Sequence, residues 1–177
     1  MHYTPVGKPI VDKTKMGLWV LDKPPKHHIF SMSVLNTKIK IPAHAKNHKE
    51  SVTREVHKDA MLYSMLPHAH FRGKAMEMSV IYPDGSNEVL LSVPNYDFNW
   101  QTSYELSEPK IIPAGSKLVQ HNWWDNSGQN KANPDPSIEV TWGQQSFEEM
   151  LFGNYLMRYL DEDEVAALKT RDQQKIT

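Results

Sequence analysis

From Val80 to Leu91 the chain reads Val-Ile-Tyr-Pro-Asp-Gly-Ser-Asn-Glu-Val-Leu-Leu, two apolar runs joined by a tight polar turn. Pro83 presets the backbone φ angle for a turn, and Gly85 accepts the positive φ that such turns require. This stretch therefore predicts a β-hairpin.

Further short segments rich in Val, Ile, Tyr and Trp lie on both sides of the hairpin, separated by Pro, Gly and Asn, as is typical of an antiparallel all-β domain. We expect strands at Gly17–Leu21, Ala60–Leu66, Glu77–Tyr82, Glu88–Val93, Ser103–Leu106 and Lys117–Trp124. We also expect a turn at Pro113-Ala114-Gly115, a surface loop over Asp125–Pro136, and core positions for Phe98, Trp100 and Trp142. The segment Asp22–Lys40, with Pro24-Pro25, resembles a connector.

Only the C-terminal end has a helical pattern. Four acidic residues, Asp161 to Glu164, suit a helix N-terminus, and good helix formers follow from Val165 to Arg171. The fold class expected is all-β, an antiparallel jelly-roll β-sandwich with a short, exposed C-terminal helix.

Composition narrows the functional classes. A net charge of −1 provides no concentrated basic face for nucleic acid, and no run of 18 apolar residues is present to cross a membrane. The first 20 residues have no signal-peptide pattern. Cysteine is absent, which excludes disulfides and thiolate metal sites and leaves nine His and nine Met as soft or borderline metal ligands.

The pair His68-Ala69-His70 is the first candidate site. A strand's period of two places both imidazoles on one face of a sheet, where they can begin a metal site, although two surface histidines at a strand end would give the same pattern. Cupins place Glu four or five residues after the second His. Lys74 and Ala75 occupy those positions here, so the cupin pattern is not met.

A specific succession of motifs follows the pair: His-Ala-His-Phe-Arg-Gly-Lys, Tyr-Pro-Asp-Gly, Tyr-Asp-Phe-Asn-Trp-Gln-Thr, Pro-Ala-Gly, Asp-Asn-Ser with Asn-Pro-Asp-Pro, and Trp-Gly-Gln-Gln-Ser-Phe-Glu-Glu-Met. Over roughly residues 1–160 the chain thereby resembles bacterial copper type II ascorbate-dependent monooxygenases, relatives of peptidylglycine α-hydroxylating monooxygenase and dopamine β-monooxygenase. The resemblance implies two β-sandwich domains with one copper each. One copper binds O2 and substrate, and the other stores an electron that comes from ascorbate or a similar donor.

By motif, His68, His70 and Met150 match the two His and the Met of the O2-binding copper, and His2 matches one of three His of the electron-storage copper. A thioether favours Cu(I), the state that meets O2. The partner histidines of His2 would lie upstream. We therefore expect residues 1–38 to be a remnant of the first copper domain plus linker, 39–160 to be the catalytic-copper sandwich, and 161–177 to be a helical tail. On this view the isolated chain binds copper without normal turnover.

The resemblance also bears on substrate and partners. Amidating relatives grip a peptide carboxylate with an Arg, an Asn and a Tyr, where this chain has Leu66, Phe152 and Asn154, so peptide substrates are not carried over. A less anionic small organic substrate is expected beside Leu66, Phe152 and Tyr155. Residues 1–38 are a candidate surface for self-association, and the resemblance implies an extracytoplasmic (periplasmic or secreted) parent protein.

Two alternatives remain open at this point. One is a non-catalytic β-sandwich that keeps the copper site or only the scaffold, as a module of a larger protein. The other is a zinc or iron jelly-roll enzyme that uses His68, His70 and a carboxylate such as Glu148 or Glu149.

Overall fold

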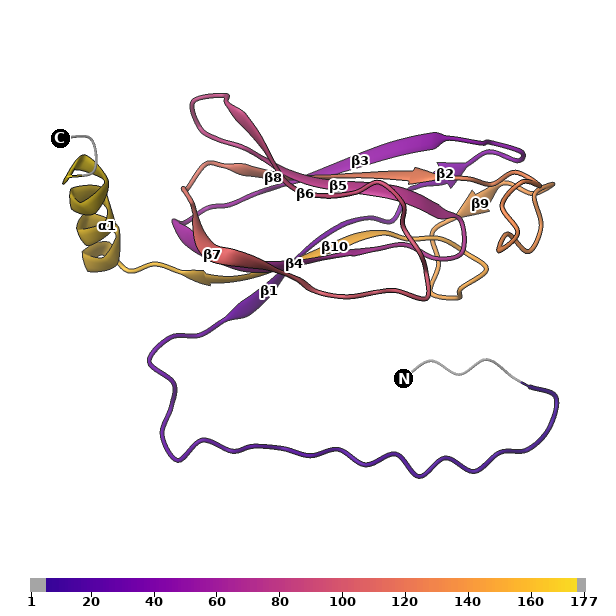
Figure 1. Cartoon of the computed structure of the whole chain (residues 1–177), viewed down its shortest axis with the longest axis horizontal. Coiled ribbons are helices and arrows are strands. Elements are labelled where there is room, and N and C mark those ends of the chain that lie inside the picture. Colours follow the sequence, from indigo (N-terminus) through magenta and orange to yellow (C-terminus); the bar gives the residue numbers. More distant parts are fainter. Residues whose placement is uncertain (1–5, 175–177) are drawn as a thin grey trace.

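The computed structural model describes residues 6–174, and these form two packed antiparallel sheets, an extended N-terminal segment and one helix (Figure 1). The elements are β1 (Phe30–Asn36), β2 (Lys40–Ile41), β3 (His48–Glu55), β4 (Ala60–His68), β5 (Gly73–Ile81), β6 (Asn87–Val93), β7 (Tyr104–Ile112), β8 (Lys117–Trp124), β9 (Val140–Thr141), β10 (Leu151–Tyr159) and α1 (Glu162–Gln174). No helix in this part of the chain is long and apolar enough to span a membrane.

The strand order is that of a jelly roll. One sheet has the order β1-β10-β4-β7 and the other β3-β8-β5-β6, while β2 and β9 form a small third sheet. Of the long strands, the first pairs with the last, β3 with β8, β4 with β7, and β5 with β6, all antiparallel. This nested pairing defines a jelly-roll sandwich, and the expected fold class is confirmed.

The predicted hairpin joins β5 to β6. The amide of Tyr82 donates to the carbonyl of Ser86 at 2.8 Å, and Gly85 has φ +86°. Asp84 accepts hydrogen bonds from both the amide and the hydroxyl of Ser86, which closes the turn. The local sequence therefore determines this connection without help from the rest of the fold.

The main core lies between the two sheets. It is built from buried side chains of β1, β4, β5, β8 and β10 and of the adjoining turns, among them Met32, Val34, Leu62, Met65, Met78, Leu118, Tyr155 and Met157. A second cluster, at the end of the sandwich that carries β2 and β9, contains Ile39, Ile41, Trp124, Val140 and Leu151. Trp142 packs against this second cluster, whereas Trp100 is 72% exposed, so the expected core position of Trp100 is wrong.

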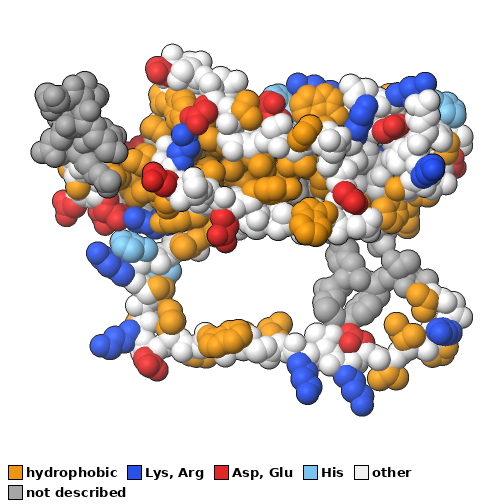
Figure 2. All heavy atoms as spheres, in the orientation of Figure 1, with side chains coloured by type: hydrophobic (Ala, Val, Ile, Leu, Met, Phe, Trp, Pro, Cys, Tyr) orange, Lys and Arg blue, Asp and Glu red, His pale blue; other side chains and the backbone are white. Residues whose placement is uncertain are grey.

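The segment before Phe30 differs from expectation. Gly17–Leu21 forms no strand, and its side chains are exposed, Trp19 at 93%. A strand requires a hydrogen-bonding partner, and this segment runs away from the sandwich without one (Figure 1). In Figure 2 its apolar side chains lie in the open, interspersed with lysines.

The expected connector also needs correction. Phe30–Asn36, inside the 1–38 segment, is a full strand that pairs with β10 along its whole length and places Met32 and Val34 in the main core. The sandwich therefore begins at Phe30 and not at residue 39. At the other end, α1 follows β10 as expected, and Arg158 of β10 binds Glu164 through both terminal guanidinium nitrogens.

Candidate metal centre

A bulge in β4 turns the histidine pair away from the core. Leu62 and Met65 both face the core although they are three residues apart, because the ladder between β10 and β4 shifts register at this point and leaves Tyr63 as an extra residue. An extra residue moves the following side chains to the opposite face. Leu66 and His68 consequently face outward. Without the bulge His68 would face the core.

The two imidazoles lie side by side at the end of β4. Their ring centroids are 5.1 Å apart in an edge-to-face arrangement, and the ring of Phe152 lies 5.9 Å from that of His68 on the same face. His70 is 4% exposed, whereas His68 is partly exposed. The pair is therefore approached from the outer face of the β1-β10-β4-β7 sheet.

Hydrogen bonds at Nδ1 determine the tautomer of both rings. Gln101 donates from Nε2 to the carbonyl of Phe98, which turns its Oε1 toward His68, and Nδ1 of His68 donates to this Oε1 at 2.6 Å. Nδ1 of His70 donates to the carbonyl of Glu148 at 3.2 Å. Because both acceptors are carbonyl oxygens, the neutral form of each ring carries its proton on Nδ1 and its lone pair on Nε2. Histidines that bind metals are oriented in this way.

The electrostatics favour a neutral imidazole at His70. Burial lowers the pKa of His70 below its ordinary value of 6.5, and the neighbouring His68 lowers it further, while the carbonyls of Glu148 and Gln145 and the charge of Glu148 act in the opposite direction. His70 is consequently uncharged near neutral pH. The neutral imidazole is the form that can coordinate a metal.

Met150 reaches the same place from 80 residues further along the chain. Phe152 pairs with His68 in the ladder between β10 and β4, and the same register extended by two residues places Met150 opposite His70. Met150 is half-buried and, by strand alternation, shares the outward face with Phe152. The extended register therefore places Met150 across from His70, at the adjoining ends of two neighbouring strands.

A buried carboxylate joins the two ligand-bearing segments. Glu149 is completely buried, and its oxygens accept hydrogen bonds from the amides of His70 at 2.8 Å, Arg72 at 2.6 Å and Met150 at 3.3 Å, and from the indole of Trp124 at 3.1 Å. Burial raises the pKa of Glu149 to about 7, and the four donors limit that rise. Every partner donates, which suits the ionised form.

Arg72 fastens the neighbouring loops to this turn. Its fully buried guanidinium donates to Oδ1 of Asn126 at 2.8 Å and to the carbonyl of Phe147 at 2.7 Å. Burial lowers the pKa of Arg72, and the carboxylates of Glu149 and Asp135 oppose that change. The expected long loop after Asp125 is thus an ordered structure anchored on Arg72.

The connection between β6 and β7 covers the histidines. The hydroxyl of Tyr96 donates to the carbonyl of Ala69 at 2.7 Å, between the two histidines. The Tyr96 ring lies so close to Gly73 that a Cβ there would be only 2.7 Å from it. Phe98, expected in the core, instead lies 6.2 Å from the His70 ring and 4.7 Å from the Phe71 ring. This connection supplies an aromatic wall beside the pair.

The three expected substrate residues separate onto two faces. Leu66 lines a shallow depression of about 120 Å³ next to the His68 end of β4, with Ser31, Ser64, Ser103, Asn154 and Leu156. Phe152 shares this outer face. Tyr155 does not, because it is completely buried in the core, where its hydroxyl donates to the carbonyl of Val119 at 3.2 Å. The expected pocket position of Tyr155 is therefore wrong.

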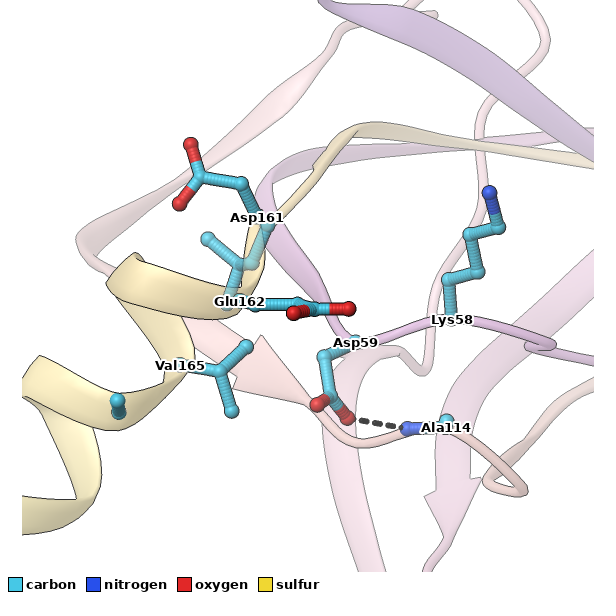
Figure 3. A pocket seen from close by; sticks show the side chains of 8 residues that line it. Lys58, Asp59, Ala114, Asp161, Glu162 and Val165 are labelled. Carbon is cyan, nitrogen blue, oxygen red and sulfur yellow. Dashed lines mark hydrogen bonds between the residues drawn. The ribbon is translucent and has the colours of Figure 1, made fainter.

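A larger hollow lies far from the histidines. It measures about 670 Å³ and is formed by the residues just before β4 and by the start of α1, with Lys58, Asp59, Asp161 and Glu162 around it (Figure 3). Since β4 separates it from His68 by roughly 30 Å, it has no part in the candidate metal centre. The expected ligand His2 lies outside the described residues.

The carboxylates of Glu148 and Glu149 have hydrogen-bond partners of their own. In residues 6–174 no three His, Asp or Glu side chains are grouped so as to hold a metal ion. The carboxylate of Glu149 faces four N–H donors, and Glu148 accepts a hydrogen bond from the amide of Gln145 at 2.9 Å. The alternative with zinc or iron bound by His68, His70 and a glutamate gains no support from these contacts.

Comparisons with known proteins add little. No protein-family model matches the chain. A solved structure of infectious bursal disease virus Gt strain is similar at a TM-score of 0.37 and 7% identity over 85% of this chain. The VP2 subviral particle of the same virus is similar at a TM-score of 0.33, with 11% sequence identity over 81% of this chain. The chain spans 35% and 32% of those chains, and similarity at this level carries no argument about function.

Several residues of the site were not expected from the sequence. Gln101 and Phe98 belong to the Tyr-Asp-Phe-Asn-Trp-Gln-Thr motif, which by sequence indicates only the family resemblance, and the sequence suggests Glu149 only as a possible metal ligand. The signal for Glu149 was present, because an acidic residue directly before an apolar strand must find buried donors if that strand is central.

Proposed function

We propose that the chain is the catalytic-copper domain of a copper-dependent monooxygenase that hydroxylates a C–H bond with O2 and an ascorbate-type electron donor. The observation that carries the proposal is the donor set: two imidazoles whose Nδ1 atoms donate to carbonyl oxygens, as in histidines that bind metals through Nε2, and Met150 opposite His70 in the extended strand register. Two imidazoles and a thioether suit copper and are poor ligands for Mg²⁺ or Ca²⁺.

In this proposal His68, His70 and Met150 hold the copper, which when bound supplies the one-electron chemistry with O2. Gln101 and the Glu148 carbonyl hold the two imidazoles in the metal-binding tautomer. Phe98 and Phe152 flank the rings and limit access of water from two sides.

The substrate class follows from the face beside His68. The residues that line the small depression there are serines, leucines and an asparagine, all uncharged. Arg158, further along β10, is engaged by Glu164 and by the hydroxyl of Tyr63. We therefore propose an uncharged small organic substrate. An upstream copper domain that includes His2, and an extracytoplasmic parent protein, belong to the same proposal.

Copper binding in wild type and in Met150→Leu tests the proposal. The change conserves volume and costs less than about 1.5 kcal/mol of stability. Met61→Leu is the matched control, since Met61 is also a half-buried methionine and lies near the start of β4, at the opposite end of that strand from His68. Cu(I) titration followed by X-ray absorption is expected to show one copper with two imidazoles and one sulfur in wild type and in Met61→Leu, and no sulfur in Met150→Leu.

Copper without a sulfur scatterer in the wild-type protein would contradict the proposal. The chain would then be assigned to the alternative class, a β-sandwich scaffold that retains the histidines but not the oxygen chemistry.

A further inference from the structure

We infer that Glu149 is a positioning residue that holds both halves of the ligand set in place before metal arrives. The inference rests on the proposed function and concerns how the site is built. One carboxylate accepts the amides of His70 and Met150, which belong to segments 80 residues apart.

The carboxylate is itself fixed on its backbone side. The amide of Glu149 donates to the carbonyl of Thr141 at 3.2 Å, and the carbonyl of Glu149 accepts the amide of Gly143 at 3.1 Å. The side chain is therefore anchored to the β9 region independently of the histidines. A carboxylate held in this way fixes the positions of the backbone amides that donate to it.

The turn that carries His70 is held by the Glu149 carboxylate. After β4 ends at His68, the chain reverses through Phe71 and Arg72 into β5, and the amide of Gly73 donates to the carbonyl of His70 at 3.0 Å. The amides of His70 and Arg72 point inward to the carboxylate. Since buried amides must be paired, removing the carboxylate leaves both without an acceptor and frees the turn to move.

The two carboxylate oxygens accept different numbers of hydrogen bonds. Oε2 accepts from the amides of His70 and Met150 and from the Trp124 indole, whereas Oε1 accepts only from the amide of Arg72. A glutamine can keep its oxygen at the Oε2 position and the three hydrogen bonds there, while its NH2 group faces the amide of Arg72, from which it cannot accept a hydrogen bond. Glu149→Gln is consequently the conservative variant, and Glu149→Ala is the complete removal.

The first measurement uses the metal-free protein. Amide hydrogen exchange at His70 and Arg72 is expected to accelerate by about 5- to 150-fold in Glu149→Ala and less in Glu149→Gln, because a buried amide that loses its acceptor costs about 1–3 kcal/mol. The core amides of Met78 and Leu118 are expected to keep their protection, which shows that the sandwich remains folded. Glu88→Gln, at a half-buried carboxylate bound by Tyr82 and Lys110, is the charge-matched control.

The second measurement is Cu(I) affinity of the same variants. Loss of a residue that orients metal ligands costs about 10- to 100-fold in affinity. This loss of Cu(I) affinity is expected in Glu149→Ala, and a smaller loss in Glu149→Gln. Glu88→Gln is expected to keep the wild-type affinity. Wild-type copper binding with unchanged affinity in Glu149→Ala would overturn the positioning role alone. Unchanged exchange at His70 and Arg72 would overturn it as well. Wild-type protein that binds no copper would instead overturn the proposed function, and the positioning role with it.

If Glu149→Ala does not fold, the same two measurements on Glu149→Gln test the inference. Intermediate exchange at Arg72 with a several-fold loss of copper affinity supports the inference, and wild-type values for both overturn it.

Discussion

Replacement of Arg72 by methionine is expected to be the most damaging single change near the site that leaves every metal ligand in place. The guanidinium makes two short hydrogen bonds, to Asn126 Oδ1 and to the Phe147 carbonyl, at 2.8 and 2.7 Å. Its third contact, to the Asp135 carbonyl, is long at 3.4 Å and adds little. Methionine fills much of the same volume but satisfies none of these acceptors.

The magnitude follows from these contacts. Hydrogen bonds to a charged donor contribute about 1.5–3 kcal/mol each, so the two short ones amount to roughly 3–6 kcal/mol. Removing the buried guanidinium also removes its desolvation cost, which offsets part of this loss. At the same time the buried Glu149 carboxylate loses the favourable interaction with the positive charge of Arg72. A loss of about 3–5 kcal/mol is therefore expected, as for other broken buried charge networks.

Urea and thermal unfolding measure this loss. A domain of this size shifts its Tm by about 2–4 °C per kcal/mol, so Arg72→Met is expected to melt roughly 6–20 °C below wild type. Arg54→Met is the matched control, because Arg54 is exposed and donates to the Ser33 carbonyl from the surface. Its loss is expected to stay below about 1 kcal/mol. If the two variants were equally stable, the buried network would have no energetic weight and the reasoning would be refuted.

The remaining predictions concern the two ends of the chain. The hydrogen bond from Arg158 holds the pKa of the Glu164 carboxyl at about 2, below its ordinary 4.5, so docking of α1 is favoured above pH 4.5 and is expected to weaken as the pH falls toward 2. Amide exchange of α1 against pH measures this, and Glu164→Gln should remove that component of the pH dependence. At the other end, Trp19 is 93% exposed in an unpartnered apolar segment, and we expect concentration-dependent self-association that Trp19→Ser weakens in sedimentation velocity. A monomer at all concentrations, or an equal effect of Ile138→Ser on the distant loop, would contradict that expectation.

Several features of this protein follow from local sequence. The Tyr82–Gly85 turn, the strand at Lys117–Trp124 and the acidic start of α1 all occur where the residues predict them, because turn chemistry, β-branched and aromatic content and helix capping act over a few residues. The all-β class follows from the same short-range signals.

The edge strand β1 and the segment before it could not be assigned in this way. Phe30–Asn36 has too little periodicity to predict a strand, and it becomes one because β10 offers a complete hydrogen-bonding edge. Gly17–Leu21 has the better strand composition and remains unpaired. Pairing depends on which partner lies nearby, and composition does not specify the partner.

The candidate site shows the same division. The sequence by itself determined that two histidines lie two residues apart at a strand end and that a methionine follows after 80 residues. Only the tertiary structure decided that Met150 lies at the end of the strand next to the histidines, through the register that sets Phe152 against His68, and only the bulge at Tyr63 decided that the histidines face outward. Likewise, Tyr155 belongs to the core because a strand has two faces and the neighbouring sheet decides which of them is buried, whereas Phe98 lies beside His70 because the connection between β6 and β7 passes there.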